Sequence, residues 1–286
     1  MVNPQLRTLV PAVAPAPSLE DDFQFGCIAT AMIYASLPHS DLGEKNEFKR
    51  RHNNLSITLL VDSEIGLPCG KIPRLITAFL CTEAKRGSRE IFLGRSLNEF
   101  VEKLGMTASG GEFGTKTAVL KQAKRLFASH FTLIGEGDNS YNWRNVVLAE
   151  SGHLHWSAHC SAAKALWESQ LMLSETFFKE CVQHGVPIDL RVLQKLRSPL
   201  AIDIYVWMTY RYHAIKRPTP ISWKQLKWQF GSNYSDDEQG LENFKFGFKG
   251  ALRKAHEFYP GIHCLFDERK LVLMPARPSV LPRREG

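Results

Sequence analysis

The 286-residue sequence predicts an α+β fold in which one order of elements occurs twice behind an N-terminal helix and strand. At roughly 150 residues per domain, this length fits two domains. Each half has the pattern helix, strand, helix, turn, helix and then strand, and the positive charge falls in two blocks within these halves. This is the order of a winged helix, a helix-turn-helix variant in which a β-hairpin follows the third helix. We therefore expect tandem winged-helix (helix-turn-helix) domains.

The N-terminal extension contains one expected helix and one expected strand. Residues 23–37 are largely apolar and end at Pro38, which is typical of a helix. After a polar, irregular stretch, residues 55–63 alternate in polarity and are rich in β-branched side chains, which predicts a strand. Residues 1–22 contain several prolines, and we interpret them as a flexible tail.

The first expected domain covers residues 23–185 and includes this extension. Apolar residues at helical spacing define its helices, with Ser96 and Glu99 in capping-box positions and Gly105 as a stop signal. Its expected elements, in order, are a helix at 73–86, a strand at 89–94, helices at 96–105 and 115–130, a strand from 131, a loose insertion at 141–164, and segments 165–173 and 176–183 that close the hairpin.

The second expected domain covers residues 186–276, and residues 277–286 are interpreted as a second flexible tail. The signals are of the same kind, with turn residues between periodic segments. Its expected elements are a short helix ending at Pro199, a strongly apolar helix at 200–215, a strand at 219–223, helices at 223–231 and 241–260, and a hairpin at 263–275 that turns at 267–270.

Charge and cysteine usage narrow the class of protein. Residues 71–130 hold 11 Lys or Arg against 5 Asp or Glu, and residues 189–286 hold 17 against 10, whereas the remaining segments are acidic. The two basic blocks are suited to neutralising phosphates. No apolar stretch reaches the ~18–20 residues of a membrane helix. The scattered cysteines without a CxxC motif indicate reduced thiols in a cytoplasmic protein.

The third helix of each half has a basic face opposite its apolar face. In helix-turn-helix proteins this helix lies in the major groove, where long cations contact phosphates and guanine. Phe246 lies near the basic face of the second such helix, and the pattern favours core packing over contact with a thymine methyl group. The residues that we expect to contact DNA are Lys116, Thr117, Lys121, Lys124 and Arg125 in the first helix, and Lys245, Lys249, Arg253 and His256 in the second.

Motifs for covalent chemistry are mostly missing. There is no Walker-type phosphate loop and no GxSxG serine elbow, so we expect a protein that is not an enzyme and has no cofactor or bound metal. The exception is His153-Leu154-His155, which matches the His-hydrophobic-His pattern of metal-dependent nicking enzymes. His159 and Cys160 follow, but the segment has low periodicity and lacks a tyrosine-bearing helix with acidic neighbours. A nicking enzyme is the less favoured alternative.

Several short motifs occur in order along residues 25–276. They are IGLP and PRL within 65–75, TEA at 82–84, LGRSL at 93–97, GG at 110–111, RLF at 125–127, SPLAIDIYVWMTYR at 198–211, QFGSNYSDDEQGLENFK at 229–245, and the closing LVLMP. Through these motifs the chain resembles the plasmid-encoded RepA replication-initiator family.

The resemblance implies binding to double-stranded origin DNA, often at repeated sites, and opening of an adjacent AT-rich region. It also implies recruitment of the host initiator and the replicative helicase, and control through a homodimer with the N-terminal region as its interface. A transcriptional regulator with the same DNA-binding parts is the alternative. Sequence does not separate the two, because initiators often repress their own promoters.

Overall fold

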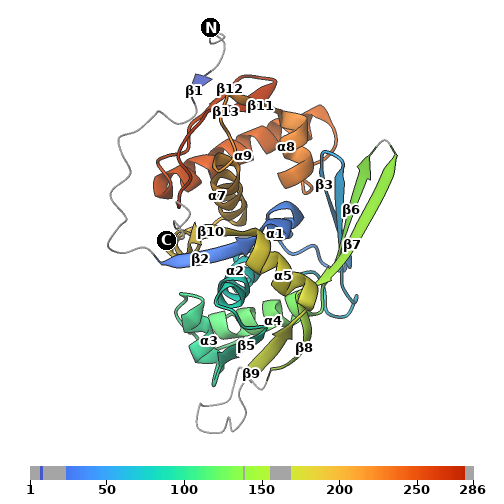
Figure 1. Cartoon of the computed structure of the whole chain (residues 1–286), viewed down its shortest axis with the longest axis vertical. Helices are drawn as coiled ribbons and strands as arrows, with labels where there is room; N and C mark the ends of the chain where they lie inside the picture. Colours follow the sequence, from blue (N-terminus) through green and yellow to red (C-terminus); the bar gives the residue numbers. More distant parts are fainter. Residues whose placement is uncertain (1–6, 9–23, 138, 155–168, 281–286) are drawn as a thin grey trace.

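The structure, a computed structural model, describes residues 7–8, 24–137, 139–154 and 169–280. It is a mixed α+β protein, as the sequence predicts. Two units with the same order of elements lie in the lower and upper halves of Figure 1, and a further sheet projects to one side of them. Within the described ranges, no helix combines the length and apolar character needed to cross a membrane.

The first unit consists of three helices and a three-stranded sheet. Its elements are α2 (Lys71–Lys85), β5 (Glu90–Gly94), α3 (Leu97–Lys103), α4 (Thr115–Phe127), β8 (Ala149–His153) and β9 (Ser169–Leu173). Strand β9 lies between β5 and β8 and is antiparallel to both. The Ser96 side chain accepts a hydrogen bond from the Glu99 backbone N–H, and Gly105, with φ of +70°, follows the end of α3. The Ser96 cap and the Gly105 stop signal are therefore confirmed, whereas the capping box is incomplete because the Glu99 carboxylate accepts from the Arg95 backbone N–H.

The second unit repeats this order of elements. It contains α7 (Pro199–Tyr212), β11 (Thr219–Ser222), α8 (Trp223–Phe230), α9 (Glu238–Phe258), β12 (Cys264–Phe266) and β13 (Lys270–Leu273). Here β13 lies between β11 and β12, so in both units the last strand is flanked by the other two. Ser222 and Gln225 form a complete capping box at the start of α8. The expected helices and hairpin of this half are confirmed.

Residues from the two predicted tails contact the second unit. Strand β1 (Arg7–Thr8) pairs with β12. The rest of the predicted N-terminal tail, residues 1–6 and 9–22, lies outside the described residues. At the other end, the Tyr259 hydroxyl donates to the Arg277 carbonyl, and Ser279 Oγ lies 3.1 Å from Tyr205 Oη. Both ends of the described chain therefore lie against the second unit.

The third sheet is an addition to the first unit. It contains β3 (Glu47–His52), β4 (Leu55–Leu60), β6 (His130–Gly137) and β7 (Ser140–Val147), in that order across the sheet. In the sequence, the β6–β7 hairpin lies between α4 and β8, and in Figure 1 it extends along the right side. The expectation of a loose insertion at 141–164 is therefore wrong for its described part, where β7 and β8 lie. The sequence does not predict strand β7 because most of its residues are exposed and polar, so the segment lacks the alternation of apolar and polar residues that predicts a strand.

Two other expectations about secondary structure are wrong. Residues 23–37 are not one helix, because Phe25–Ala29 forms strand β2 before the short helix α1 (Thr30–Ala35). Strand β2 pairs with β10 (Gly185–Asp189), which precedes helix α6 (Leu190–Lys195). The segment 176–183 is not a hairpin strand but part of α5 (Glu175–His184), since Ser174 caps it and Phe177 and Cys181 are buried one turn apart.

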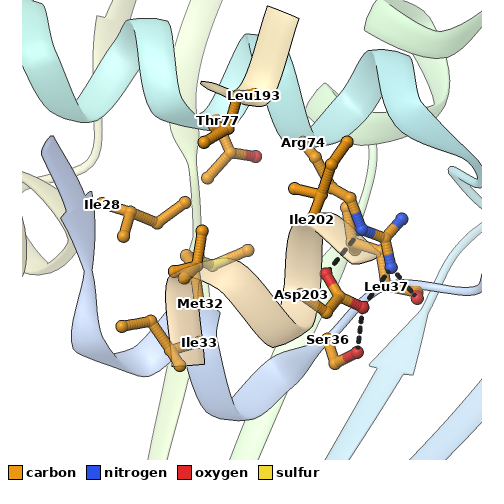
Figure 2. Close-up of a pocket in the computed structure, with 11 residues that line it drawn as sticks. Ile28, Met32, Ile33, Ser36, Leu37, Arg74, Thr77, Leu193, Ile202 and Asp203 are labelled. Carbon is orange, nitrogen blue, oxygen red and sulfur yellow. Dashed lines mark hydrogen bonds and ion pairs between the residues drawn. The ribbon is translucent and has the colours of Figure 1, made fainter. Parts of the chain in front are cut away.

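A buried ion pair joins the two units. Arg74 on α2 and Asp203 on α7 form two hydrogen bonds, Nε to Oδ1 at 2.6 Å and Nη2 to Oδ2 at 2.7 Å. Arg74 also donates to the carbonyl groups of Leu37 and Pro38, and Ser36 Oγ donates to Asp203. Figure 2 shows Ser36, Leu37, Arg74 and Asp203, which line a cavity of about 30 Å³, enough for about one water molecule. We call this group, together with His39 and Arg50, the junction cluster.

The junction cluster carries more positive than negative charge. Besides Arg74 and Ser36, Asp203 has a third hydrogen-bond partner, His39, whose Nε2 lies 2.9 Å from Asp203 Oδ2. Burial lowers the pKa of His39, which favours its neutral form. Burial also lowers the pKa of Arg50 to about 9. The Arg50 guanidinium stacks 4.5 Å from the Phe48 ring centroid, and its two terminal nitrogens have no hydrogen-bond partner among the described residues. Asp203 is therefore the one carboxylate of this cluster that balances two buried guanidinium groups.

Candidate nucleic-acid interface

Helix α9 packs through one apolar stripe and exposes the opposite side. The buried stripe contains Phe244, Phe248, Ala251, Leu252 and Ala255. At 100° per residue, the opposite side falls on Gln239, Glu242, Asn243, Phe246, Gly250, Arg253 and Glu257. Phe246 is 83% exposed, so the prediction that it packs in the core is wrong. The outer face of α9 is thus centred on a phenylalanine.

Of the four residues predicted to contact DNA from α9, Arg253 lies on this outer face and the other three lie towards one edge of it. Arg253 is exposed. The Lys245 side chain is only 12% exposed and pairs with Glu242. Lys249 Nζ lies 4.1 Å from the Phe266 ring centroid and 5.3 Å from that of Trp223. His256 is half-buried, and burial lowers its pKa. Of the four, Arg253 is the residue best placed to reach a ligand outside the protein.

Of the five residues predicted to contact DNA from α4, three are at least partly exposed, and two, Thr117 and Arg125, are engaged in hydrogen bonds within the protein. Lys121 and Lys124 are exposed, and Lys116 is half-exposed. Thr117 Oγ1 donates to the Gly111 carbonyl at 2.8 Å and so closes the glycine turn before the helix. Arg125 is 8% exposed. The outer face of α4 therefore carries Lys121 and Lys124.

Arg125 holds a loop instead of facing solvent. Its Nη1 donates to Asp41 Oδ2 at 2.9 Å and to the Leu67 carbonyl at 3.1 Å, and its Nε donates to the Ile65 carbonyl at 3.1 Å. A guanidinium group that already satisfies three acceptors inside the protein has little left for DNA. We leave Arg125 out of the proposed interface for this reason.

Sequence reasoning missed two exposed cations and several exposed aromatic rings. Lys254 is exposed on α9, and Arg269 is exposed at the β12–β13 turn, where Asp267 Oδ1 accepts hydrogen bonds from the Arg269 and Lys270 backbone N–H groups. Phe113, in the turn before α4, is 96% exposed. Tyr141 and Trp143 project from β7 with ring centroids 5.9 Å apart. The predicted hairpin turn at 267–270 was the available signal for Arg269.

The described part of the histidine motif forms no metal centre. His153 ends β8, whereas His155, His159 and Cys160 lie outside the described residues. Among the described residues there is no group of three or more His, Cys, Asp or Glu side chains that could hold a metal ion.

The fold and these surfaces define an α+β protein with two copies of one helical unit, each of which presents an outward-facing helix with exposed cations. The chain belongs to the plasmid-encoded RepA protein family, whose sequence profile matches residues 67–225, more than half of its length. The predicted resemblance is therefore confirmed.

Two solved structures share the fold. A crystal structure of RctB domains 2 and 3 is 12% identical, with a TM-score of 0.54, and the match covers 86% of this chain and 97% of that chain. A selenomethionine derivative of the same two domains is 9% identical, with a TM-score of 0.55, and covers 88% and 97%. No curated protein matches the sequence. At these identities the likeness concerns the fold alone.

Proposed function

We propose that the protein is a plasmid replication initiator that binds double-stranded origin DNA sequence-specifically through two winged helices. Membership of the plasmid-encoded RepA family carries the proposal. Each unit also has the parts of a winged helix, namely three helices and a hairpin that pairs with the strand after the first helix. In this assignment α4 and α9 enter major grooves, and the β8–β9 and β12–β13 hairpins are the wings.

The proposed domains keep the predicted limits, 23–185 and 186–276. The second begins within β10, whose pairing with β2 joins the two domains, as does the junction cluster. Two helices held in one rigid arrangement can address major grooves about one helical turn apart. Sites at a fixed spacing are therefore the DNA that such a protein fits best.

Exposed cations supply the affinity of the proposed complex. Lys121 and Lys124 on α4, Arg253 and Lys254 on α9, and Arg269 in the second wing would contact phosphates, releasing counterions. The proposed function further includes opening of the origin, recruitment of the host initiator and replicative helicase in the cytoplasm, and a homodimeric form. It includes no covalent chemistry by this chain.

Supplying the gene in trans is expected to drive replication of a vector whose only origin is the cognate plasmid fragment. The measurement is the number of transformants and plasmid copies in a suitable host. A variant with Arg253→Glu and Lys254→Glu, produced at the same level, is the matched control and should give none. If the wild-type protein represses its promoter but supports no replication, the transcriptional-regulator alternative replaces the initiator.

Supercoiled origin DNA incubated with the protein and Mg²⁺ or Mn²⁺ is expected to remain intact, because the proposed initiator cleaves no phosphodiester bond. Agarose gels that resolve nicked from supercoiled circles measure this. The His153→Ala and His155→Ala variants are the controls for trace nuclease. A nick that disappears in the His155→Ala variant would show that the nicking-enzyme alternative is correct.

A further inference from the structure

Phe246 occupies an unusual position for a large apolar side chain. It lies at the middle of the outer face of α9, with the buried Phe244 and Phe248 on the opposite side. A single exposed apolar residue is common on protein surfaces, but a fully projecting aromatic ring on a helix assigned to a groove is a candidate contact. The ring is not needed for packing, since it is 83% exposed.

The residues along the same line of the helix are suited to contact with base edges. Asn243 lies one turn before Phe246, and its Oδ1 accepts a hydrogen bond from Gln239 Nε2 at 3.1 Å, which orients the Asn243 amide. Gly250 lies one turn after Phe246, and a Cβ atom there would meet nothing within 4 Å. Packing therefore gives no reason for a glycine, which destabilises a helix interior relative to alanine. We call Asn243, Phe246, Gly250 and Arg253 the α9 stripe.

We infer that the α9 stripe reads a thymine-containing step in the major groove, with the Phe246 ring packed on a thymine C5-methyl group. The inference rests on the proposed function, because it assumes that α9 enters the groove. An A·T pair presents this methyl group and the adenine N6 and N7 atoms, to which asparagine binds through its amide. Gly250 lets the helix backbone approach the bases, and Arg253 reaches a guanine or a phosphate beyond them.

Duplex DNA fits this face better than a second copy of the chain does. The exposed cations Arg253 and Lys254 follow Phe246 on α9, and Arg269 is exposed at the β12–β13 turn. The carboxylate of Glu242, one turn before Phe246, is neutralised by its ion pair with Lys245, and Glu257 lies one turn beyond Arg253. An α9–α9 contact between two copies would bring these cations together, and like charges repel. The ring and its surroundings thus match an apolar methyl group inside an anionic groove.

Replacing thymine by uracil in the bound duplex tests the contact, because it removes only the C5-methyl group. The full chain first enriches duplexes from a random-sequence pool, and each thymine of the enriched duplex is then changed singly to uracil. At one or two positions uracil is expected to weaken wild-type binding roughly four-fold, the factor that corresponds to burial of one methyl group. The Phe246→Ala variant should bind the thymine and uracil duplexes equally.

Three further variants complete the design. Tyr141→Ala removes an exposed ring far from α9 along the chain and should keep the full uracil effect. Phe246→Leu keeps an apolar side chain and should retain part of it. Gly250→Ala should raise the thermal unfolding midpoint while weakening DNA binding, since a methyl group stabilises the helix and fills the space over the bases. A Phe246→Ala protein with an unchanged unfolding midpoint is correctly folded.

The outcomes separate this inference from the proposed function. Failure of the wild-type chain to enrich any duplex refutes the proposed function and the inference with it. Enrichment followed by the same uracil response in wild-type and Phe246→Ala proteins refutes the inference alone. A loss of self-association in the Phe246→Ala variant, with no change in uracil response, assigns the ring to a second copy of the chain and overturns the inference.

Discussion

Replacing Asp203 by alanine is expected to lower the free energy of unfolding by about 3–5 kcal/mol, the cost of leaving a buried guanidinium group without its counterion. Asp203 is the bidentate partner of Arg74, and both side chains are almost fully buried. The change also removes the acceptor of Ser36 and His39. Urea unfolding followed by far-ultraviolet circular dichroism measures the difference.

An ion pair that is exposed on both sides provides the control for this prediction. Glu47 pairs with Lys49 at 2.9 Å, and the two side chains are 46% and 64% exposed. Glu47→Ala should therefore leave the unfolding midpoint almost unchanged, because solvent screens such pairs. Equal unfolding midpoints for Asp203→Ala and Glu47→Ala would mean that the junction cluster does not hold the two units together.

The Arg74–Asp203 pair makes the free energy of unfolding depend on pH in the acid range. Burial alone would raise the pKa of Asp203, but the charge of Arg74 and hydrogen bonds from Arg74 and His39 outweigh it and hold the pKa below its usual range. A carboxyl group with a lowered folded-state pKa stabilises the protein fully above about pH 4, and this contribution is lost as the pH falls. The stability of Asp203→Asn should therefore fall less steeply in this acid range than that of the wild-type protein.

Reversing the charge of both outward helices at once is expected to abolish DNA binding at moderate salt. The variant carries Lys121→Glu and Lys124→Glu on α4 with Arg253→Glu and Lys254→Glu on α9, all exposed positions. Each lost phosphate contact removes about 0.9 from the slope of log affinity against log salt, and the new carboxylates repel the backbone. Fluorescence anisotropy of a labelled duplex across a salt series measures both affinity and slope.

The control is a charge reversal of the same kind elsewhere. Lys179→Glu on α5 changes an exposed lysine that pairs with Glu175, away from both helices in the sequence. It should reduce affinity slightly through net charge and leave the salt slope unchanged. If the variant with all four substitutions still binds with the wild-type salt slope, the interface lies on another surface.

The parts of the fold that the sequence predicted well are those with local signals. The second unit is the clearest case, because Ser198 caps α7 directly before Pro199, Ser222 and Gln225 cap α8, and Gly231 follows its last residue. Each signal acts within one turn of the helix that it begins or ends. The three helices of each unit could therefore be predicted in the correct order.

The errors arise where distant segments decide the structure. Residues 25–29 form a strand because they pair with residues 185–189. No signal in the sequence next to residues 25–29 indicates this distant pairing. The candidate site follows the same rule. Arg125 has a basic side chain on a helix, but Asp41 and the carbonyl groups of Ile65 and Leu67 occupy it. The helical period places Phe246 opposite Phe244 and Phe248, but a large apolar side chain is usually buried, and that general preference gave the wrong expectation for Phe246.

The pairing of β1 with β12 changes what counts as a separable piece of this protein. Residues 7–8 belong to the sheet of the second unit, and residues 277–279 pack against the same unit. In chain order, the first unit therefore lies between two segments of the second unit, namely strand β1 and the elements from α7 onwards. A single proteolytic cut near residue 185 would leave the second unit in two fragments, so isolating either unit cleanly requires two cuts. Fusion partners attached ahead of Arg7 would emerge beside β12 in the second unit rather than beside α4.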